Sequence, residues 1–507
     1  MPPRKPLPQQ LPKICIALGL PTVAKLLQHA QNEIEGGELF LEFRLDYLPD
    51  PNEGAKAIAG FLESNPEASI LATCRRHQNH GKYNGSIDEQ IRILELAVRS
   101  GACAIDVEIE SAESAPSKLD HLRAESTLIL SYHNYEGTPP PETILKRMLK
   151  IPAHAYKVVT TAKKPNDSHK LLALAKSFPR EKLILLAMGE AGFPTRVLSP
   201  AWGGVYTYAA PTSAEGTASG QVSARLLRNL YRIEKFSKNA KIFGVVADPV
   251  RHSISPQVHN RAFQSKRIDA VYLPLLVQPA HMKDFFAFAD NLPLSGCSIT
   301  IPHKQKIIRY LDVVEPLARR IGAVNTIWKK AGKWRGTNTD AAGVTVPLSK
   351  RLKLNKASVL IVGNGGAARG AAFALADAGA KISLAGRNLD RVRALSRICG
   401  GEPLSRDQAV QKHFDVVVHA TPIGMWPNVK ECFFDDHIPG EIVFDMVYNP
   451  METLLLAKAK NQGREVINGL QMFLEQAAQQ FEIFTGETAP RAVMEKAALE
   501  ALGAKSG

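Results

Sequence analysis

Residues 359–388, VLIVGNGGAARGAAFALADAGAKISLAGRN, predict a strand, a glycine-rich turn, a helix and a second strand. Glycine at such a turn tolerates positive φ and lets backbone N–H groups approach a phosphate at the helix N-terminus. GNGGAARG is a close variant of the GxGxxG pattern, with Ala368 at the third glycine position. The stretch therefore predicts a dinucleotide-binding unit, and a plain strand-to-helix connection is the alternative. Such a unit usually opens its domain, whereas 358 residues precede this one.

The end of the second strand indicates which dinucleotide is bound. SLAGRN, residues 383–388, lacks the Asp or Glu that would bind a ribose 2′-hydroxyl. Arg387 and Arg391 are present instead, and they suit a 2′-phosphate, which favours NADP over NAD. Two solvated surface arginines are the alternative interpretation.

Length and composition indicate a globular protein of several domains. The 507 residues have room for two to four domains, and 45% are hydrophobic and 22% charged. The six cysteines form no CxxC pair, which predicts free thiols in a reducing compartment and no zinc site. The N-terminal MPPRKPLPQQLPK is short and interrupted by proline, so it resembles neither a signal nor a transit peptide. We expect a cytoplasmic location.

The chain is basic, with a net charge of +14. A nucleic-acid binder is one interpretation of this charge. However, Lys and Arg are spread along the chain without an aromatic-interleaved basic run. We therefore expect small anionic substrates or a solvated basic surface, and no nucleic-acid or membrane partner.

Residues 14–230 contain a regular series of eight short β-rich runs with helical stretches in most of the gaps. This alternation predicts a (β/α)8 TIM barrel, whose chemistry lies at the carboxyl ends of the strands. The runs are ICIALGL from Ile14, LFLEFRLDYL from Leu39, SILATCR from Ser69, AIDVEIE from Ala104, TLILSYHNY from Thr127, AYKVVTTA from Ala155, KLILLAMG from Lys182 and GGVYTYAA from Gly203.

Charged and polar residues lie in or directly after these runs. An unpaired buried charge costs several kcal/mol, so these groups must contact each other or a ligand. They are Glu42, Arg44 and Asp46, Arg75, Asp106 and Glu108, His133, Lys157 and Arg196.

Lys157 and His133 are the candidate catalytic pair of the barrel. Lys157 is flanked by β-branched and aromatic residues, so its amine should be desolvated and able to form a Schiff base with a ketone. The alternative is a lysine merely paired with Glu42 or Glu108. His133 on the neighbouring strand can transfer protons. Together with nearby arginines, the two residues indicate an imine-forming lyase for an anionic substrate.

Six motifs of the first half, over residues 12–230, resemble the type I 3-dehydroquinate dehydratase family. They are EFRLDYL, DVEIE, SYHNYEGTP, YKVVTTA, MGEAGFPTR and EGTASGQV. The resemblance implies that Lys157 forms the imine and that His133 removes a proton and returns one to the departing hydroxyl. It implies a substrate site of Glu42, Arg44, Arg75, Arg196, Thr217 and Gln221.

Two loops depart from that family's pattern. Asn79, in RRHQNHGKYNG, stands where the family usually has an acidic residue. Thr217 and Ser219, in TASGQ, stand in a loop that is usually similar to SAPGQ. Both loops would cover the substrate, so we expect the changes to alter affinity or rate.

The second half carries a different set of motifs after a charged linker at residues 232–241. Ser253 and Ser255 lie at a turn before a helix and can bind a carboxylate, or merely cap the helix. Lys304, after IPH, and Asp340 are each expected to open a helix. As a pair they can give a proton to a developing alkoxide, with a surface ion pair as the alternative.

Residues 242–507 resemble the shikimate dehydrogenase family, through the motifs ADPVRHSISPQVHN, GCSITIPHK, IGAVNTI, GTNTDAAG, ATPIGM, FDMVYNPMET and NGLQMFLEQAAQQFEIFTG. The resemblance implies proton chemistry by Lys304 and Asp340. It implies a substrate site of Ser253, Ser255, Thr300, Asn325, Tyr448 and Gln476. The implied NADP site comprises Gly363, Asn364, Gly365, Gly366, Ala367, Arg387, Asn388, Arg391, Met446 and Gly469.

The whole chain therefore resembles the bifunctional dehydratase–dehydrogenases of aromatic amino-acid biosynthesis. The expected α/β architecture is a barrel over residues 1–234, a substrate domain over 241–342 completed by 470–507, and a Rossmann-type NADP domain over 343–469. The resemblance implies dehydration of 3-dehydroquinate to 3-dehydroshikimate and NADPH-dependent reduction to shikimate. A quinate-directed dehydrogenase, or a ligand-binding sensor with an impaired dehydratase half, is the alternative. We expect a monomer or a homodimer, and no bound metal.

Overall fold

The computed structural model describes residues 11–212, 216–218 and 220–503. Ser219, one of the three unusual loop residues, lies outside these ranges. The chain divides into two compact units, residues 1–240 with 275–292, and residues 241–274 with 293–507. Each unit is described by itself.

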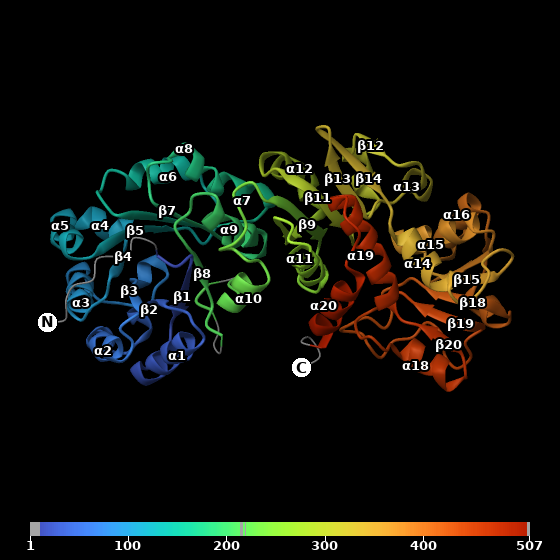
Figure 1. Cartoon of the computed structure of the whole chain (residues 1–507), viewed down its shortest axis with the longest axis horizontal. Coiled ribbons are helices and arrows are strands. Elements are labelled where there is room, and N and C mark those ends of the chain that lie inside the picture. Colours follow the sequence, from blue (N-terminus) through green and yellow to red (C-terminus); the bar gives the residue numbers. More distant parts are fainter. Residues whose placement is uncertain (1–10, 213–215, 219, 504–507) are drawn as a thin grey trace. The chain divides into compact units, whose positions relative to one another are not determined.

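The first unit contains an eight-stranded parallel sheet that curls into a nearly closed barrel (Figure 1). Its strand order is β7-β6-β5-β4-β3-β2-β1-β8, and a single bridge between Leu183 and Gly204 joins the two ends. This confirms the predicted (β/α)8 barrel. The strands are β1 (Ile14–Leu18), β2 (Phe40–Arg44), β3 (Ser69–Thr73), β4 (Ala104–Glu108), β5 (Thr127–His133), β6 (Ala155–Thr161), β7 (Leu183–Met188) and β8 (Thr207–Ala209).

Helices follow the strands and cover the outside of the barrel. Most have clear local start signals, such as the capping box of α3, in which Ser86 and Glu89 satisfy each other's backbone N–H groups. The helices are α1 (Val23–Glu35), α2 (Pro51–Ser64), α3 (Ile87–Arg99), α4 (Ile109–Ser114), α5 (Pro116–Glu125), α6 (Pro141–Met148), α7 (Pro165–Leu172), α8 (Leu174–Ser177), α9 (Phe193–Leu198) and α10 (Ala224–Asn229).

The barrel interior is filled by inward-facing side chains from all eight strands. Because side chains alternate along a strand, every second residue faces inward. The buried cluster includes Cys15, Phe40, Leu71, Ala104, Ile129, Ala155, Ile184, Tyr206 and Tyr208.

A six-stranded mixed sheet follows the predicted linker, at whose end β9 begins. Its order is β10-β9-β11-β13-β14-β12, with β13 antiparallel to both neighbours. The strands are β9 (Lys241–Ala247), β10 (Ala270–Leu276), β11 (Leu294–Ile299), β12 (Val313–Val314), β13 (Thr326–Lys330) and β14 (Lys333–Thr337). The helices along this stretch are α11 (Ser255–Ser265), α12 (Met282–Asn291), α13 (Pro316–Ile321) and α14 (Asp340–Ser349).

A parallel six-stranded sheet has the order β17-β16-β15-β18-β19-β20, which is the doubly wound Rossmann-type arrangement. Its strands are β15 (Ser358–Val362), β16 (Lys381–Ala385), β17 (Glu402–Pro403), β18 (Phe414–His419), β19 (Gly440–Asp445) and β20 (Glu465–Ile467). The helices are α15 (Gly366–Asp377), α16 (Leu389–Cys399), α17 (Arg406–Val410), α18 (Leu454–Asn461), α19 (Gly469–Thr485) and α20 (Arg491–Gly503). The expected boundary at residue 342 falls inside α14, and the domain limits stay a prediction.

No helix in the described part of the chain combines the length and apolarity that a bilayer crossing requires.

Candidate functional sites

One layer of the barrel interior is polar. Because side chains alternate along a strand with a period of two, each of five neighbouring strands contributes one polar residue to this layer. Each of these residues lies two positions after a core residue such as Phe40 or Ala155. All five residues of this layer are buried. They are Glu42, Thr73, Asp106, Ser131 and Lys157.

Lys157 is buried in this layer and is paired with Asp106. Its Nζ atom lies 2.8 Å from Asp106 Oδ2 and 3.8 Å from Glu42 Oε1. Of the two carboxylates named in the alternative interpretation, Glu42 is thus the more distant partner of the amine, and Asp106 is the nearer one. Glu108 lies one inward step farther along β4, where it accepts hydrogen bonds from Gln90 and the Arg76 backbone.

Asp106 is held as a carboxylate. Burial opposes its charge, but Lys157 and Arg75 bring its pKa below the usual value. Ser131 also donates a hydrogen bond of 2.6 Å to it. The Lys157 amine therefore faces a fixed negative charge that can stabilise a cation at Nζ, whether ammonium or imine.

His133 ends β5 beside this layer. Its Nδ1 atom is buried and has no hydrogen-bond partner. Burial, followed by the charges of Arg75 and Lys157, lowers the pKa of His133 well below 6.5. The imidazole is consequently neutral at pH 7, the form that a general base requires.

Three arginines are buried in the same unit. Arg44 makes a two-point ion pair with Asp46, at 2.9 and 2.8 Å. Arg75 lies 3.7 Å from Asp106. Arg196 is fully buried, and burial lowers its pKa to about 10. A cluster of cations inside a barrel mouth suits an anionic ligand.

The covering loops hold the remaining predicted residues. Gln221 accepts a bond from the Ala218 backbone and lies 3.5 Å from Thr217 Oγ1. Asn79 donates a hydrogen bond of 2.8 Å to Glu110.

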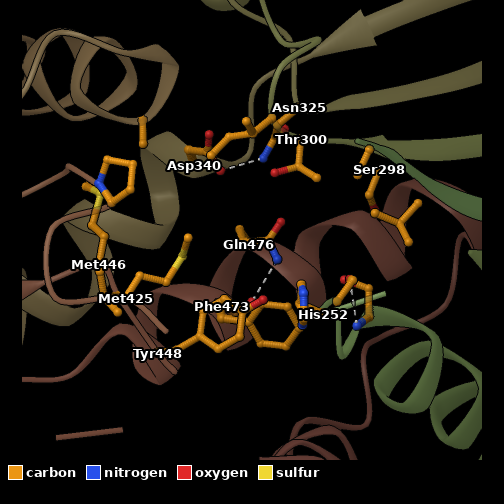
Figure 2. A pocket seen from close by; sticks show the side chains of 18 of the residues that line it. His252, Ser298, Thr300, Asn325, Asp340, Met425, Met446, Tyr448, Phe473 and Gln476 are labelled. Carbon is orange, nitrogen blue, oxygen red and sulfur yellow. Dashed lines mark hydrogen bonds between the residues drawn. The ribbon is translucent and has the colours of Figure 1, made fainter. Parts of the chain in front are cut away.

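The second unit contains a cavity of about 370 Å³ between the two sheets' ends (Figure 2). It brings together the predicted proton-transfer pair and all the predicted substrate-binding residues of this half. Those lining residues are Ser253, Ser255, Thr300, Lys304, Asn325, Asp340, Tyr448 and Gln476. Ala367 and Met446 are the two predicted cofactor residues that also line it.

The predicted proton-transfer pair is formed. Lys304 Nζ lies 2.6 Å from Asp340 Oδ2. Asn325 donates to the other carboxylate oxygen of Asp340 at 2.8 Å (Figure 2). Asp340 begins α14 as expected, but Lys304 does not open a helix. It lies in a turn fixed by the bond from His303 N to Thr300 O, ahead of a short 3₁₀ segment at Lys306–Tyr310.

Hydroxyl and amide groups line the rest of the cavity. Ser255 N donates to Ser253 Oγ at 3.2 Å. Burial raises the pKa of Tyr448 to about 12, so its hydroxyl stays neutral. Gln476 donates to Phe473 O at 3.0 Å, which leaves its side-chain oxygen available (Figure 2).

The glycine turn fits a dinucleotide phosphate. Gly363 has a φ of +132°, and a Cβ there would lie 2.8 Å from Ala420 O. Gly365 has open space around it, and no side chain caps the N-terminus of α15. The free N–H groups of that helix can therefore hold a phosphate, with Arg387 and Arg391 following β16.

A buried hydrogen-bond chain links the loops after β18 and β19, and sequence reasoning missed it. His419 Nδ1 lies 2.9 Å from Asp445 Oδ1, its Nε2 lies 2.5 Å from Thr421 Oγ1, and Thr453 donates to Asp445 at 2.6 Å. Thr421 lines the cavity. The only sequence signal was a polar residue ending each of two apolar strands.

These two sites define a chain with an imine-forming barrel and a dinucleotide-dependent dehydrogenase. Four family models match it in this order. They are type I 3-dehydroquinase at residues 14–238, shikimate dehydrogenase substrate-binding domain at 245–327, shikimate/quinate 5-dehydrogenase at 347–424 and shikimate 5′-dehydrogenase C-terminal domain at 469–499.

The relatives agree with these matches. The bifunctional 3-dehydroquinate dehydratase/shikimate dehydrogenase of Arabidopsis thaliana chloroplasts is 33% identical over 94% of this chain and 83% of its own length. The NADP⁺ shikimate dehydrogenase of Moorella thermoacetica is 40% identical over 52% of this chain and 95% of its own. A crystal structure of shikimate dehydrogenase with NADP⁺ matches with a TM-score of 0.51 and 35% identity, covering 53% of this chain and 97% of that one. The chain belongs to the bifunctional 3-dehydroquinate dehydratase/shikimate dehydrogenase family.

Proposed function

We propose that the barrel dehydrates 3-dehydroquinate through an imine on Lys157. The neutral amine adds to the substrate ketone and water leaves, which forms the imine. His133 removes a proton from the adjacent carbon, and the resulting enamine expels the hydroxyl as His133 returns the proton. Hydrolysis of the imine then releases 3-dehydroshikimate and the lysine.

The observation that carries this proposal is the buried amine beside a neutral histidine. Asp106 stabilises the positive charge that develops at Nζ. Glu42, Arg44, Arg75, Arg196, Thr217 and Gln221 would hold the carboxylate and hydroxyls of the substrate.

Borohydride reduction tests the imine. Incubation with 3-dehydroquinate and borohydride should inactivate the dehydratase and add the reduced substrate to Lys157, as peptide mass spectrometry would detect. Lys157→Ala is the matched control and should take up no label. Label on another lysine, with Lys157 unmodified, would overturn the assignment.

We further propose that the second unit reduces 3-dehydroshikimate to shikimate. NADPH, when bound at the glycine turn, supplies the hydride. Lys304 donates the proton to the developing alkoxide. Asp340 holds the Lys304 amine in place, and Asn325 in turn donates a hydrogen bond to the other carboxylate oxygen of Asp340. Ser253 and Ser255 would bind the carboxylate, and Thr300, Tyr448 and Gln476 would contact the rest of the ring.

Lys304→Ala tests this role. Shikimate oxidation, followed as NADPH absorbance, should fall by about 10²-fold or more because a positioned proton-transfer group is lost. Binding of NADP⁺, measured by calorimetry, should change little. Unchanged turnover would refute the role, and joint loss of turnover and NADP⁺ binding would indicate a damaged site.

The same assays decide between shikimate and quinate as the dehydrogenase substrate. We propose shikimate, because Ser255 and Thr300 place hydroxyls at the cavity. Activity on quinate alone, or an inactive barrel that still binds ligand, would favour the alternative. The proposed reducing, cytoplasmic setting is supported by six free cysteines.

A further inference from the structure

The Lys157 amine has a second close partner besides Asp106, the hydroxyl of Tyr208 on β8. Lys157 Nζ lies 3.0 Å from this oxygen and 4.3 Å from the centre of the tyrosine ring. Both side chains are buried. The contact joins β6 to β8 across the barrel interior, so the barrel fold and not local sequence brings it about.

Tyr208 is not isolated. Its hydroxyl lies 3.2 Å from that of Tyr206, which directly precedes β8 and whose side chain also faces the interior. Burial raises the pKa of both phenols well above 10, so both stay neutral throughout the working pH range. Tyr208 can therefore accept a hydrogen bond from the ammonium while donating its own proton to Tyr206.

The groups facing Nζ come from several strands. Asp106 and Glu42 are the nearby carboxylates. Arg75, Arg44 and Lys157 all act electrostatically on the neutral His133 nearby, and the Cys15 thiol lies within electrostatic range of Lys157. Asp106 and Tyr208 are the two groups within hydrogen-bond distance of Nζ among the contacts of the described residues.

We propose that Tyr208 is a positioning residue for the imine-forming lysine. Its hydroxyl oxygen accepts a hydrogen bond from the Lys157 ammonium and so sets the pH at which the amine becomes nucleophilic. This inference rests on the proposed dehydratase function. Because the bond stabilises the charged amine, its removal disfavours the ammonium, and the amine should lose its proton at a lower pH.

The substitution Tyr208→Phe tests this directly, because it removes the hydroxyl and keeps the ring over Nζ. The rate of borohydride-trapped imine formation at low substrate concentration is measured against pH, with cyanoborohydride at the acidic end. The midpoint of the rise should move down by about one pH unit, the size expected for one hydrogen bond to a charged group. An unmoved or raised midpoint would overturn the proposal.

Tyr206→Phe is the matched control. It removes a buried hydroxyl that contacts Tyr208 but not Lys157, and the shift of the midpoint should be clearly smaller. Equal shifts in both variants would show that the direct contact is not the determinant. If Tyr208→Phe does not fold, 3-fluorotyrosine can replace Tyr208 instead. It weakens the hydroxyl oxygen as a hydrogen-bond acceptor without changing the side chain's bulk, so the midpoint should move down by less than is expected for Tyr208→Phe.

Failure of the underlying function is distinguishable from failure of this inference. If Lys157 takes no label in the unsubstituted protein, the dehydratase mechanism itself is wrong. If Lys157 is labelled and the midpoint of Tyr208→Phe equals that of the unsubstituted protein, only the role of Tyr208 is wrong.

Discussion

His133 illustrates how burial prepares one side chain for proton transfer. The free imidazole would be partly protonated near pH 6.5, but desolvation and the cations Arg75 and Lys157 favour its neutral form. When Lys157 becomes an imine, the positive charge at Nζ can be kept, so a cationic neighbour remains. His133 would thus be available as the proposed base in the complex in which it is proposed to act.

A pH prediction follows from the direction of this shift. As pH falls, His133 becomes protonated only well below 6.5, so kcat for dehydration should stay level between pH 7.5 and 6.5 and decline at lower pH. The kcat profile reports groups in the enzyme–substrate complex, where Lys157 is already bonded to substrate. Steady-state rates at saturating 3-dehydroquinate provide the measurement. A half-fall of kcat above pH 6.5 would contradict the assignment of His133 as the base.

Individual contacts mark the limit of what the sequence predicts. The strand period placed Lys157 and His133 on adjacent strands, and both positions are confirmed. Lys157 contacts Asp106 more closely than Glu42 or Glu108. This preference depends on side-chain lengths on three different strands, and no local sequence pattern encodes it. The hydroxyl of Tyr208 reaches Nζ only because β8 closes against β1. Lys304 was wrongly assigned to a helix because IPHK forms a turn stabilised by tertiary neighbours.

At the predicted cofactor site, the start of α19 and the loop after β19 approach each other closely through their backbones. Gly469 begins α19, and a Cβ there would lie 2.5 Å from Met446 O and 2.4 Å from Val447 O. Glycine is thus required for the start of this helix to pack on the loop after β19. Val447 in this loop donates a backbone hydrogen bond to Asp445 at the end of β19, so the position of the helix and the shape of the cavity are linked.

Gly469→Ala should therefore destabilise the protein by about 1–3 kcal/mol, the usual cost of overpacking. It should also weaken NADP⁺ binding, because Met446 is displaced. Chemical denaturation and calorimetry measure the two effects. Gly365→Ala is the matched control, because an added Cβ meets no atom within 4 Å. It should leave stability unchanged but weaken NADP⁺ binding at the helix N-terminus. Full NADP⁺ affinity in both variants would argue against this cofactor site.

The chain joins two catalysts whose chemistry is sequential but independent. The residues proposed for dehydration lie in the first unit, and those proposed for reduction and NADP binding lie in the second. No residue of one proposed site belongs to the other. Loss of one activity should therefore leave the other intact.

A mixture of two single-site variants tests this independence. Lys157→Ala should retain reduction of added 3-dehydroshikimate and lose dehydration, and Lys304→Ala should show the reverse. Neither alone should oxidise NADPH appreciably when given 3-dehydroquinate. Equal amounts of both should restore NADPH oxidation after a lag that shortens as protein concentration rises, because the intermediate must diffuse between molecules. If the mixture stays inactive while each variant keeps its own half-reaction, the intermediate passes only within one chain, and the two sites are not independent.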